Sequence, residues 1–308
     1  MGGHRVTLLG LGTYRSHDAA ASASVAASAG CPLIDTAPVY GNGKHQSAIA
    51  PVLREHPSIR VTSKVGYMTE GQARVALSAG DLTGEDVRFR HSIAPEYVRH
   101  QIAMSRTELR RPVLDVVYLH NPEHDHQKRG DLHKRIRDAF GALEEATAAG
   151  TIRGYGVATW SGFDTGAFTV RDLVRLAQEA AGRPETGLRA IQLPVSLVKI
   201  TPIRDALLGN GPIGRASEAG LEVWASAPLH GGKLIRLVNE RLARYISEGA
   251  SPVEAALLVT ASVPGLTGML ISTSSTEHWA NAASVVGGPL LPETRIKDIS
   301  DLLLREHA

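Results

Sequence analysis

Four polar side chains stand at or just beyond the ends of apolar, strand-like runs in this sequence. Asp35, Lys64 and His120 each close such a run, and Tyr40 follows Asp35 by five residues. A tyrosine titrates at about pH 10 and is a weak acid at neutral pH, but a neighbouring ammonium favours the phenolate and lowers that pKa. Asp35 would keep Lys64 charged, and His120 would donate to a carbonyl oxygen. The set suits protonation of an oxyanion as a hydride reaches carbon, and the reverse reaction.

Each of the four residues also has an ordinary structural interpretation. Asp35 suits a turn or a helix cap, and Lys64 suits a salt bridge. Tyr40 suits core packing, and His120 a hydrogen-bonded position at the rim of a sheet. Their occurrence at successive strand ends favours a shared role, although neither a strong nucleophile nor a metal-ligand spacing accompanies them.

The elements that must position these residues follow a regular rhythm. Eight short apolar runs predict strands at 6–10, 32–35, 59–64, 114–120, 154–158, 190–194, 221–226 and 268–272. Segments with apolar residues at helical spacing separate them, such as 95–109 and 132–150. This alternation predicts an α/β fold, a (β/α)8 TIM barrel that fills residues 1–308 as a single domain, with a doubly wound open sheet as the alternative. In a barrel the carboxyl ends of the strands meet at one mouth, which brings the four side chains together.

One long segment interrupts the rhythm. Residues 67–93, rich in glycine and charge, form an irregular loop insert between the third strand and its helix, and we expect them to overhang the barrel mouth. Two helix starts are marked by capping boxes, in which a serine precedes a glutamate by three residues. These are Ser251 with Glu254 and Ser274 with Glu277.

The composition excludes several classes of protein. The net charge is +2, with acidic and basic residues interleaved and no long basic run, so nucleic acid is not an expected partner. The single cysteine excludes an internal disulfide. No apolar run approaches the ~18 residues of a membrane span, and no leader pattern stands at the start, so we expect a cytoplasmic protein.

The quoted motifs resemble those of the aldo-keto reductases. They are LLGLGTYR, IDTAPVYGNG, VTSKVG, DVVYLHNPE, YGVATW, AIQLP, WASAPLHGGKL and LISTSSTEHWANA. The resemblance implies an NAD(P)(H)-dependent oxidoreductase on a (β/α)8 barrel. It makes Tyr40 the proton donor, Lys64 its partner, Asp35 the partner of the lysine, and His120 the residue that orients the carbonyl. A family variant with glutamate in place of the histidine reduces carbon–carbon double bonds, so His120 favours carbonyl and alcohol chemistry.

The same resemblance implies a set of cofactor contacts. They are Gly12, Thr13, Tyr14, Asp35, Thr159, Gln192, Ser226, Ala227, Leu229, Gly231, Ser272, Thr273, Ser274 and His278. Thr159 and Gln192 are expected to hold the carboxamide, although Ala158 replaces the usual serine. Ser226 stands where a stacking tyrosine is common; Trp224 could replace it but more plausibly packs in the core. The backbone of 227–232 suits a pyrophosphate.

The cofactor signals also show departures from family patterns. Arg15 replaces the third glycine of a dinucleotide fingerprint. The loop after the eighth strand carries no lysine or arginine for a 2′-phosphate, so NADP(H) over NAD(H) is expected from the family alone. The pair His124 and His126 indicates a surface loop rather than a metal site, and His91 suits either the substrate mouth or the surface.

Other functions stay open beside the reduction of a small-molecule carbonyl or oxidation of an alcohol. One is a cofactor-binding regulatory protein, and the intact four-residue set argues against it. Another is a redox-neutral enzyme, such as an epimerase, that uses tightly bound NAD(P). A third is an unrelated hydrolase or lyase barrel, but the sequence shows neither the nucleophile–base pair nor the metal-ligand set that such an enzyme needs. The identity of the substrate and the oligomeric state are not indicated by the sequence.

Overall fold

The computed structural model describes residues 7–124 and 129–305. Within them, eight parallel strands close into a barrel in chain order, and the last strand pairs with the first. This closure confirms the predicted (β/α)8 barrel and excludes the open sheet. The strands are β1 (Leu8–Gly12), β2 (Leu33–Asp35), β3 (Arg60–Val65), β4 (Val116–His120), β5 (Tyr155–Ala158), β6 (Leu188–Pro194), β7 (Glu222–Ser226) and β8 (Gly268–Ile271). Each overlaps a predicted run; the first predicted run begins at residue 6, outside the described residues.

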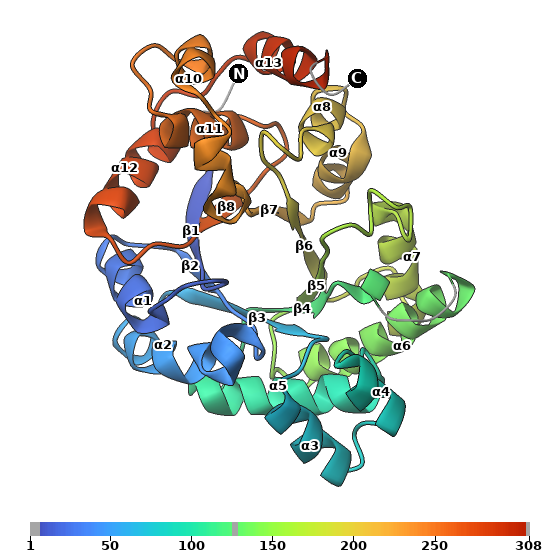
Figure 1. The fold of residues 1–308 in the computed structure, drawn as a ribbon. Helices are drawn as coiled ribbons and strands as arrows, with labels where there is room; N and C mark the ends of the chain where they lie inside the picture. The colour runs from blue at the N-terminus through green and yellow to red at the C-terminus, as the bar shows by residue number, and fades with distance from the viewer. Residues whose placement is uncertain (1–6, 125–128, 306–308) are drawn as a thin grey trace.

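Helices surround the barrel (Figure 1). The α-helices outside the 67–93 segment are α1 (Ala19–Ser28), α2 (His45–Glu55), α5 (Pro95–Leu109), α6 (Arg129–Ala148), α7 (Val170–Ala181), α8 (Thr201–Leu207), α9 (Gly211–Glu218), α10 (Glu240–Ile246), α11 (Pro252–Ala261), α12 (Thr276–Gly287) and α13 (Glu293–Arg305). Three 3-10 turns, η1 (Tyr40–Gly43), η2 (Pro122–His124) and η3 (His230–Arg236), follow β2, β4 and β7. None of the helices in the described part of the chain is long and apolar enough to span a membrane.

The barrel interior is filled by side chains, and this filling helps to position the predicted site residues. Val116 and Tyr118 of β4 pack with Ala158 and Ala190 in one inner cluster. Because side chains alternate along a strand, the next residue on that side of β4 is His120, at the carboxyl end. Trp224 packs with Leu33 and Leu270 in a second cluster, which confirms its expected core role.

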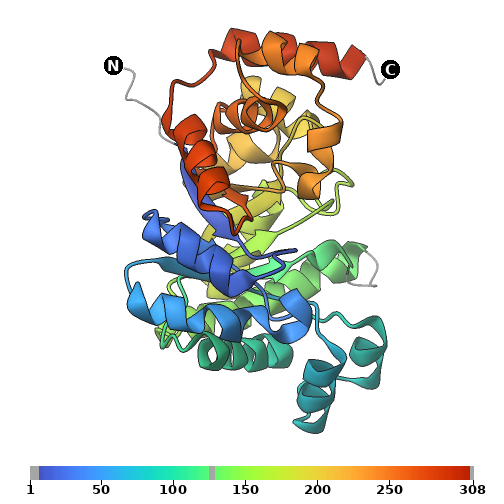
Figure 2. The same cartoon turned by 60° about the vertical axis from the view of Figure 1, so that its left-hand side comes forward.

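The segment 67–93 differs from the expectation of an irregular insert. It contains two helices, α3 (Glu70–Ser78) and α4 (Gly84–Phe89). Each begins with a capping box, Thr69 with Gln72 and Thr83 with Asp86, which satisfies free backbone N–H groups at the helix start. Both helices project from the periphery of the barrel beyond α5 rather than across its mouth (Figures 1 and 2).

One of the two predicted helix caps is confirmed and the other is wrong. Ser251 and Glu254 form the expected capping box at α11. At α12 the helix begins at Thr276, so the capping side chain is Ser275, which accepts from the backbone N–H of His278. Ser274 lies one residue too early and is exposed.

Candidate active site

A cavity of about 1370 Å³ opens at the carboxyl ends of the strands. Residues at the ends of β1, β2 and β4 to β8 line it, together with Tyr67 from the loop after β3. Most small-molecule pockets occupy roughly 300–1,000 Å³. The cavity is therefore large enough for a ligand bigger than a single small metabolite.

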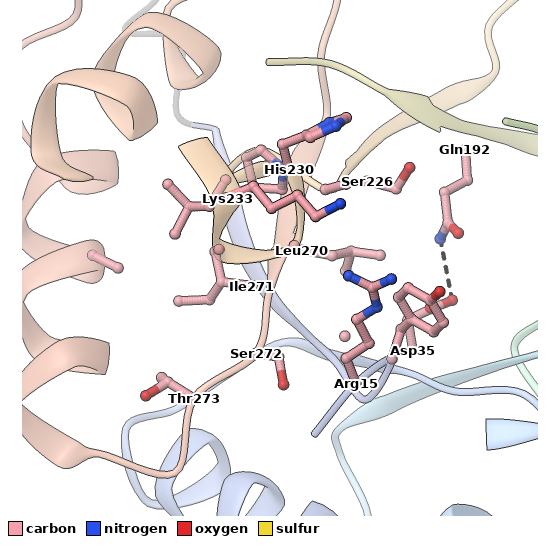
Figure 3. Close-up of a pocket in the computed structure, with 18 of the residues that line it drawn as sticks. Arg15, Asp35, Gln192, Ser226, His230, Lys233, Leu270, Ile271, Ser272 and Thr273 are labelled. Atoms are coloured by element: carbon pink, nitrogen blue, oxygen red, sulfur yellow. Dashed lines mark hydrogen bonds between the residues drawn. The ribbon is translucent and has the colours of Figure 1, made fainter. Parts of the chain in front are cut away.

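At the base of this cavity the predicted contact between Asp35 and Lys64 is present. Lys64 Nζ donates to Asp35 Oδ2 at 2.5 Å and to the carbonyl oxygen of Thr36 at 3.0 Å. The other carboxylate oxygen, Oδ1, accepts from Thr62 Oγ1 at 2.7 Å and from Gln192 Nε2 at 3.1 Å (Figure 3). Both charged side chains are almost fully buried. The carboxylate thus fixes the lysine of the neighbouring strand and is itself held from β3 and β6.

Tyr40 and His120 lie next to this ion pair. Lys64 Nζ is 5.1 Å from the centroid of the Tyr40 ring. The rings of Tyr40 and His120 meet edge to face with centroids 5.9 Å apart. Both rings line the cavity, and Lys64 lies behind them. The structure therefore brings all four predicted residues together.

The protonation states of the two rings follow from burial. Desolvation, followed by the charge of Asp35, raises the pKa of Tyr40 well above its ordinary value. The expected lowering by Lys64 is not found, because the ring is buried and Asp35 opposes the ammonium. Burial, reinforced by Lys64 and two other histidines, holds the pKa of His120 well below its usual value. The site thus contains a protonated phenol and a neutral imidazole, which offers one N–H donor.

The loop after β3 approaches the backbone of β4 very closely. Gly66 has φ +154°, and a Cβ there would lie 2.7 Å from the carbonyl oxygen of His120. The same oxygen is 2.8 Å from Nε2 of His91. His91 is buried and does not line the cavity, so it supports β4 rather than the substrate mouth. The glycine lets the next residue, Tyr67, lie against His120.

The carboxamide side of the site differs from the expectation for Thr159. Its hydroxyl donates to Glu123 Oε1 at 2.6 Å and accepts from the backbone N–H of Gly162 at 2.8 Å. The one hydroxyl proton is therefore engaged by Glu123. Gln192, in contrast, lines the cavity and uses one amide N–H on Asp35.

Glu123 was missed by the sequence interpretation. Besides Thr159, its Oε1 accepts backbone N–H groups of Trp160, Ser161 and Gly162 at 2.9–3.1 Å. Glu123 lies three residues after His120, and one oxygen of its carboxylate thus links the turn after β5 to η2. This turn carries Trp160, which forms part of the cavity wall. No single-sequence motif marks a contact of this kind.

The turn after β7 offers backbone rather than side chains. Ser226, Ala227, Leu229 and Gly231 line the cavity as predicted from the resemblance. Left-handed φ values at Ala227 (51°), His230 (48°) and Gly231 (65°) curl the chain. Such a concave run of backbone N–H groups is suited to an anion.

Two cations that the sequence interpretation missed flank this turn. Arg15 and Lys233 both line the cavity, and Figure 3 shows their charged ends beside the β7 turn. Arg15 Nη1 would lie 2.8 Å from a Cβ built on Gly231, so the arginine reaches across from the loop after β1. Arginine and lysine side chains that line a cavity are suited to binding an anion.

The remaining predicted contacts have mixed outcomes. Gly12, Tyr14, Ser272, Thr273 and His278 line the cavity. Two further predicted contacts, Thr13 and Ser274, do not line the cavity. Thr13 is fully buried and donates its hydroxyl to Thr36, and Ser274 lies on the surface outside the cavity.

No metal site accompanies the cavity in the part of the chain that the structure describes. His124 contacts the hydroxyl of Tyr67, whereas His126 lies outside the described residues. The fit to a nicotinamide dinucleotide is better. Asp35, Tyr40, His120 and the amide of Gln192 line the cavity, and so do the two cations Arg15 and Lys233.

Comparison with known proteins places the chain among enzymes of one family. Residues 2–243 match the model of the Aldo/keto reductase family. The chain is 29% identical to a D-threo-aldose 1-dehydrogenase from a Pseudomonas species over 136 residues, 42% of this chain and 40% of that protein. It is 30% identical to a pyridoxal 4-dehydrogenase from Microbacterium luteolum over 179 residues, 50% of this chain and 52% of that protein.

A third relative is a 6-dehydroglucose reductase from Novosphingobium aromaticivorans, 23% identical over 223 residues. That match covers 70% of this chain and 60% of that protein, so the chain spans about 40–60% of the length of these curated relatives.

Solved structures share the fold at low identity. A glycerol dehydrogenase from Gluconobacter oxydans has a TM-score of 0.69 and 20% identity, and the match covers 97% of this chain and 92% of that one. A holo-form aldo-keto reductase from Bacillus halodurans has a TM-score of 0.67 and 17% identity over the same shares of the two chains. At these identities the likeness supports the fold alone.

Proposed function

Because this chain belongs to the Aldo/keto reductase family, we propose that it moves a hydride between a nicotinamide dinucleotide and a small carbonyl or alcohol, with Tyr40 as proton donor. The observation that carries the proposal is the cluster of Asp35, Tyr40, Lys64 and His120 in one cavity. Two of these residues form a buried ion pair and the other two present a phenol and a neutral imidazole to the cavity.

The chain's own residues account for the movement of the proton. A bound reduced nicotinamide supplies the hydride. His120 donates its N–H to the carbonyl oxygen and orients it beside Tyr40. The phenol then gives its proton to the oxygen as negative charge develops there. The resulting phenolate is stabilised by the Lys64 ammonium, 5.1 Å from the ring centroid, and Asp35 keeps that ammonium in place. Oxidation of an alcohol reverses these steps.

The cofactor is held, in this proposal, by two sets of groups that line the cavity. Gln192 offers its amide to the carboxamide, and Arg15 and Lys233 with the β7 turn take the phosphates. Preference for NADP(H) over NAD(H) is a proposal that rests on the family alone. The cavity-lining residues of 272–282 contain no lysine or arginine and include the acidic Glu277.

The test is an absorbance assay at the reduced-nicotinamide band, with NADH and NADPH supplied separately to a panel of small aldehydes, ketones and alcohols. Carbonyl-dependent oxidation of at least one cofactor is expected. Bound cofactor without turnover across the panel would instead favour the regulatory alternative. A cofactor that survives purification and is regenerated in each cycle would favour the redox-neutral one.

A further inference from the structure

A second phenol faces the cavity beside the proposed proton donor. Tyr67 follows Gly66 in the loop after β3 and is partly exposed in the cavity wall. Its ring meets that of His120 edge to face, with centroids 5.0 Å apart. Tyr67 is therefore adjacent to the group that orients the reacting oxygen, yet it has no part in the proton transfer proposed above.

The hydroxyl of Tyr67 is oriented by two neighbours. Asn121 Nδ2 donates to it at 3.3 Å, and His124 Nδ1 is hydrogen-bonded to it on the other side. When the His124 proton is on Nε2, the phenol donates to Nδ1 and accepts from Asn121. A hydroxyl oxygen has two acceptor lone pairs, so one is left for an O–H from a ligand. Burial raises the pKa of Tyr67, which keeps this group a neutral phenol.

The cavity wall beside this hydroxyl contains exposed aromatic side chains that each carry a polar group. Tyr14 is 54% exposed and Trp160 is 41% exposed, and both line the cavity. Large aromatic faces left open to solvent in a cavity are typical of a binding surface. Rings with polar tips suit a ligand that presents C–H groups to a ring face and O–H groups to its edge.

We propose that Tyr67, held by Asn121 and His124, binds a hydroxyl near the reacting carbon, and that the substrate is a hydroxylated carbonyl compound of the sugar or polyol class. This inference rests on the proposed function, because it concerns a second contact within the same reaction. Tyr67 is a specificity-determining residue in this account. The proton still comes from Tyr40.

The experiment compares two aldehydes that differ in hydroxyl groups, glyceraldehyde and propanal. For the wild-type protein we expect a higher kcat/KM with glyceraldehyde. Tyr67→Phe removes one hydroxyl and leaves the ring, so it should lower kcat/KM for glyceraldehyde about tenfold, the effect of losing one hydrogen bond. Its effect on propanal should stay within about twofold, because propanal has no hydroxyl to bind.

Two further variants test whether the effect is specific to the hydroxyl of Tyr67. His124→Ala should lower the preference for glyceraldehyde less than Tyr67→Phe does, because it frees the phenol without removing it. Tyr245→Phe is the matched control, since this tyrosine lies outside the cavity against Arg295, and it should leave both substrates unchanged. Melting temperatures of all variants check that the fold is retained.

Failure of the inference differs from failure of the proposed function. Equal kcat/KM for the two aldehydes in the wild-type protein, or a preference retained in Tyr67→Phe, would overturn the hydroxyl site while propanal reduction still supported the function. Glyceraldehyde that is not turned over would also overturn the substrate class. The proposed function itself fails only if no carbonyl in the broader panel oxidises the reduced cofactor and no alcohol reduces the oxidised one.

Discussion

The two sides of the barrel mouth are built in different ways. On the side of β2 to β4, the cavity is built on buried side chains. Lys64 donates to Asp35 and to the carbonyl oxygen of Thr36, and Asp35 also accepts from a hydroxyl on β3. On the side of β7, β8 and the loop after β1, curled backbone and the exposed cations Arg15 and Lys233 line the cavity. A dry, fixed site is suited to setting protonation states, whereas an exposed, charged one is suited to a ligand that enters and leaves. The following variants test this division.

On the β2–β4 side, Lys64→Met should cause the largest losses of activity and stability. Without the ammonium the phenolate is not stabilised, so we expect kcat to fall by about 10²–10⁴-fold. The change also leaves Asp35 as an unpaired buried charge, which typically costs about 3–5 kcal/mol of stability. The measurements are kcat by absorbance and the free energy of unfolding by denaturant titration.

The double variant Asp35→Asn with Lys64→Met is the control for that loss of stability. Removing both charges should restore much of the stability, since no buried ion is left unpaired. Activity should stay low. A double variant that recovered the wild-type rate would show that Lys64 is only a structural partner.

Variants on the opposite side should change affinity rather than rate. Arg15→Ala and Lys233→Ala each remove a charge beside the β7 turn, and each should weaken cofactor binding about tenfold. The effect should shrink at high salt, because exposed charges are screened. Fluorescence titration of NADH and NADPH at two ionic strengths measures it, with Lys297→Ala on α13 as a distant control. Unchanged affinity in both variants would place the phosphates elsewhere.

Glu123 links two neighbouring loops, because it lies in η2 after β4 and its carboxylate accepts hydrogen bonds from the turn after β5. Thr159→Val removes one of its donors and Glu123→Gln removes its charge; each should lower kcat/KM about fivefold. If the pair acts together, the double variant should be less impaired than the sum predicts. Strictly additive effects in this double-mutant cycle would argue against their acting as a unit.

The pH dependence should be the smallest effect. A depressed pKa means that His120 takes up a proton only well below its ordinary value, so the neutral imidazole persists through about pH 6.5. A raised pKa means that Tyr40 keeps its proton above about pH 10. Reductive kcat/KM should therefore be nearly flat from about pH 6.5 to 9. A fall centred near pH 6.5 would contradict the neutral histidine.

The sequence predicted the residues whose position follows from chain periodicity. Asp35 and His120 end their strands and Lys64 lies one residue before the end of β3, and strand alternation with barrel closure brings such ends to one mouth. The strand positions were predictable for the same reason. The capping sequences at Thr69 and Thr83 were also visible, but the polar composition of that segment suggested a loop.

What the sequence did not predict depends on contacts between distant segments. The hydroxyl of Thr159 appears free until Glu123, 36 residues earlier, is placed beside it. Arg15 and Lys233 lie far apart in the chain and line one cavity because β1 and β7 both flank β8. The pKa of Tyr40 depends on burial, which no local sequence pattern predicts. Distances across the barrel are set by packing and not by the spacing of residues along the sequence.

The most direct test of the central claim is Tyr40→Phe, which removes the proposed donor hydroxyl and keeps the ring. We expect kcat for carbonyl reduction to fall by about 10²–10⁴-fold. The dissociation constant of the reduced cofactor, measured by fluorescence titration on the same protein, should change less than about twofold. A variant that retained the wild-type rate would show that Tyr40 is not the proton donor.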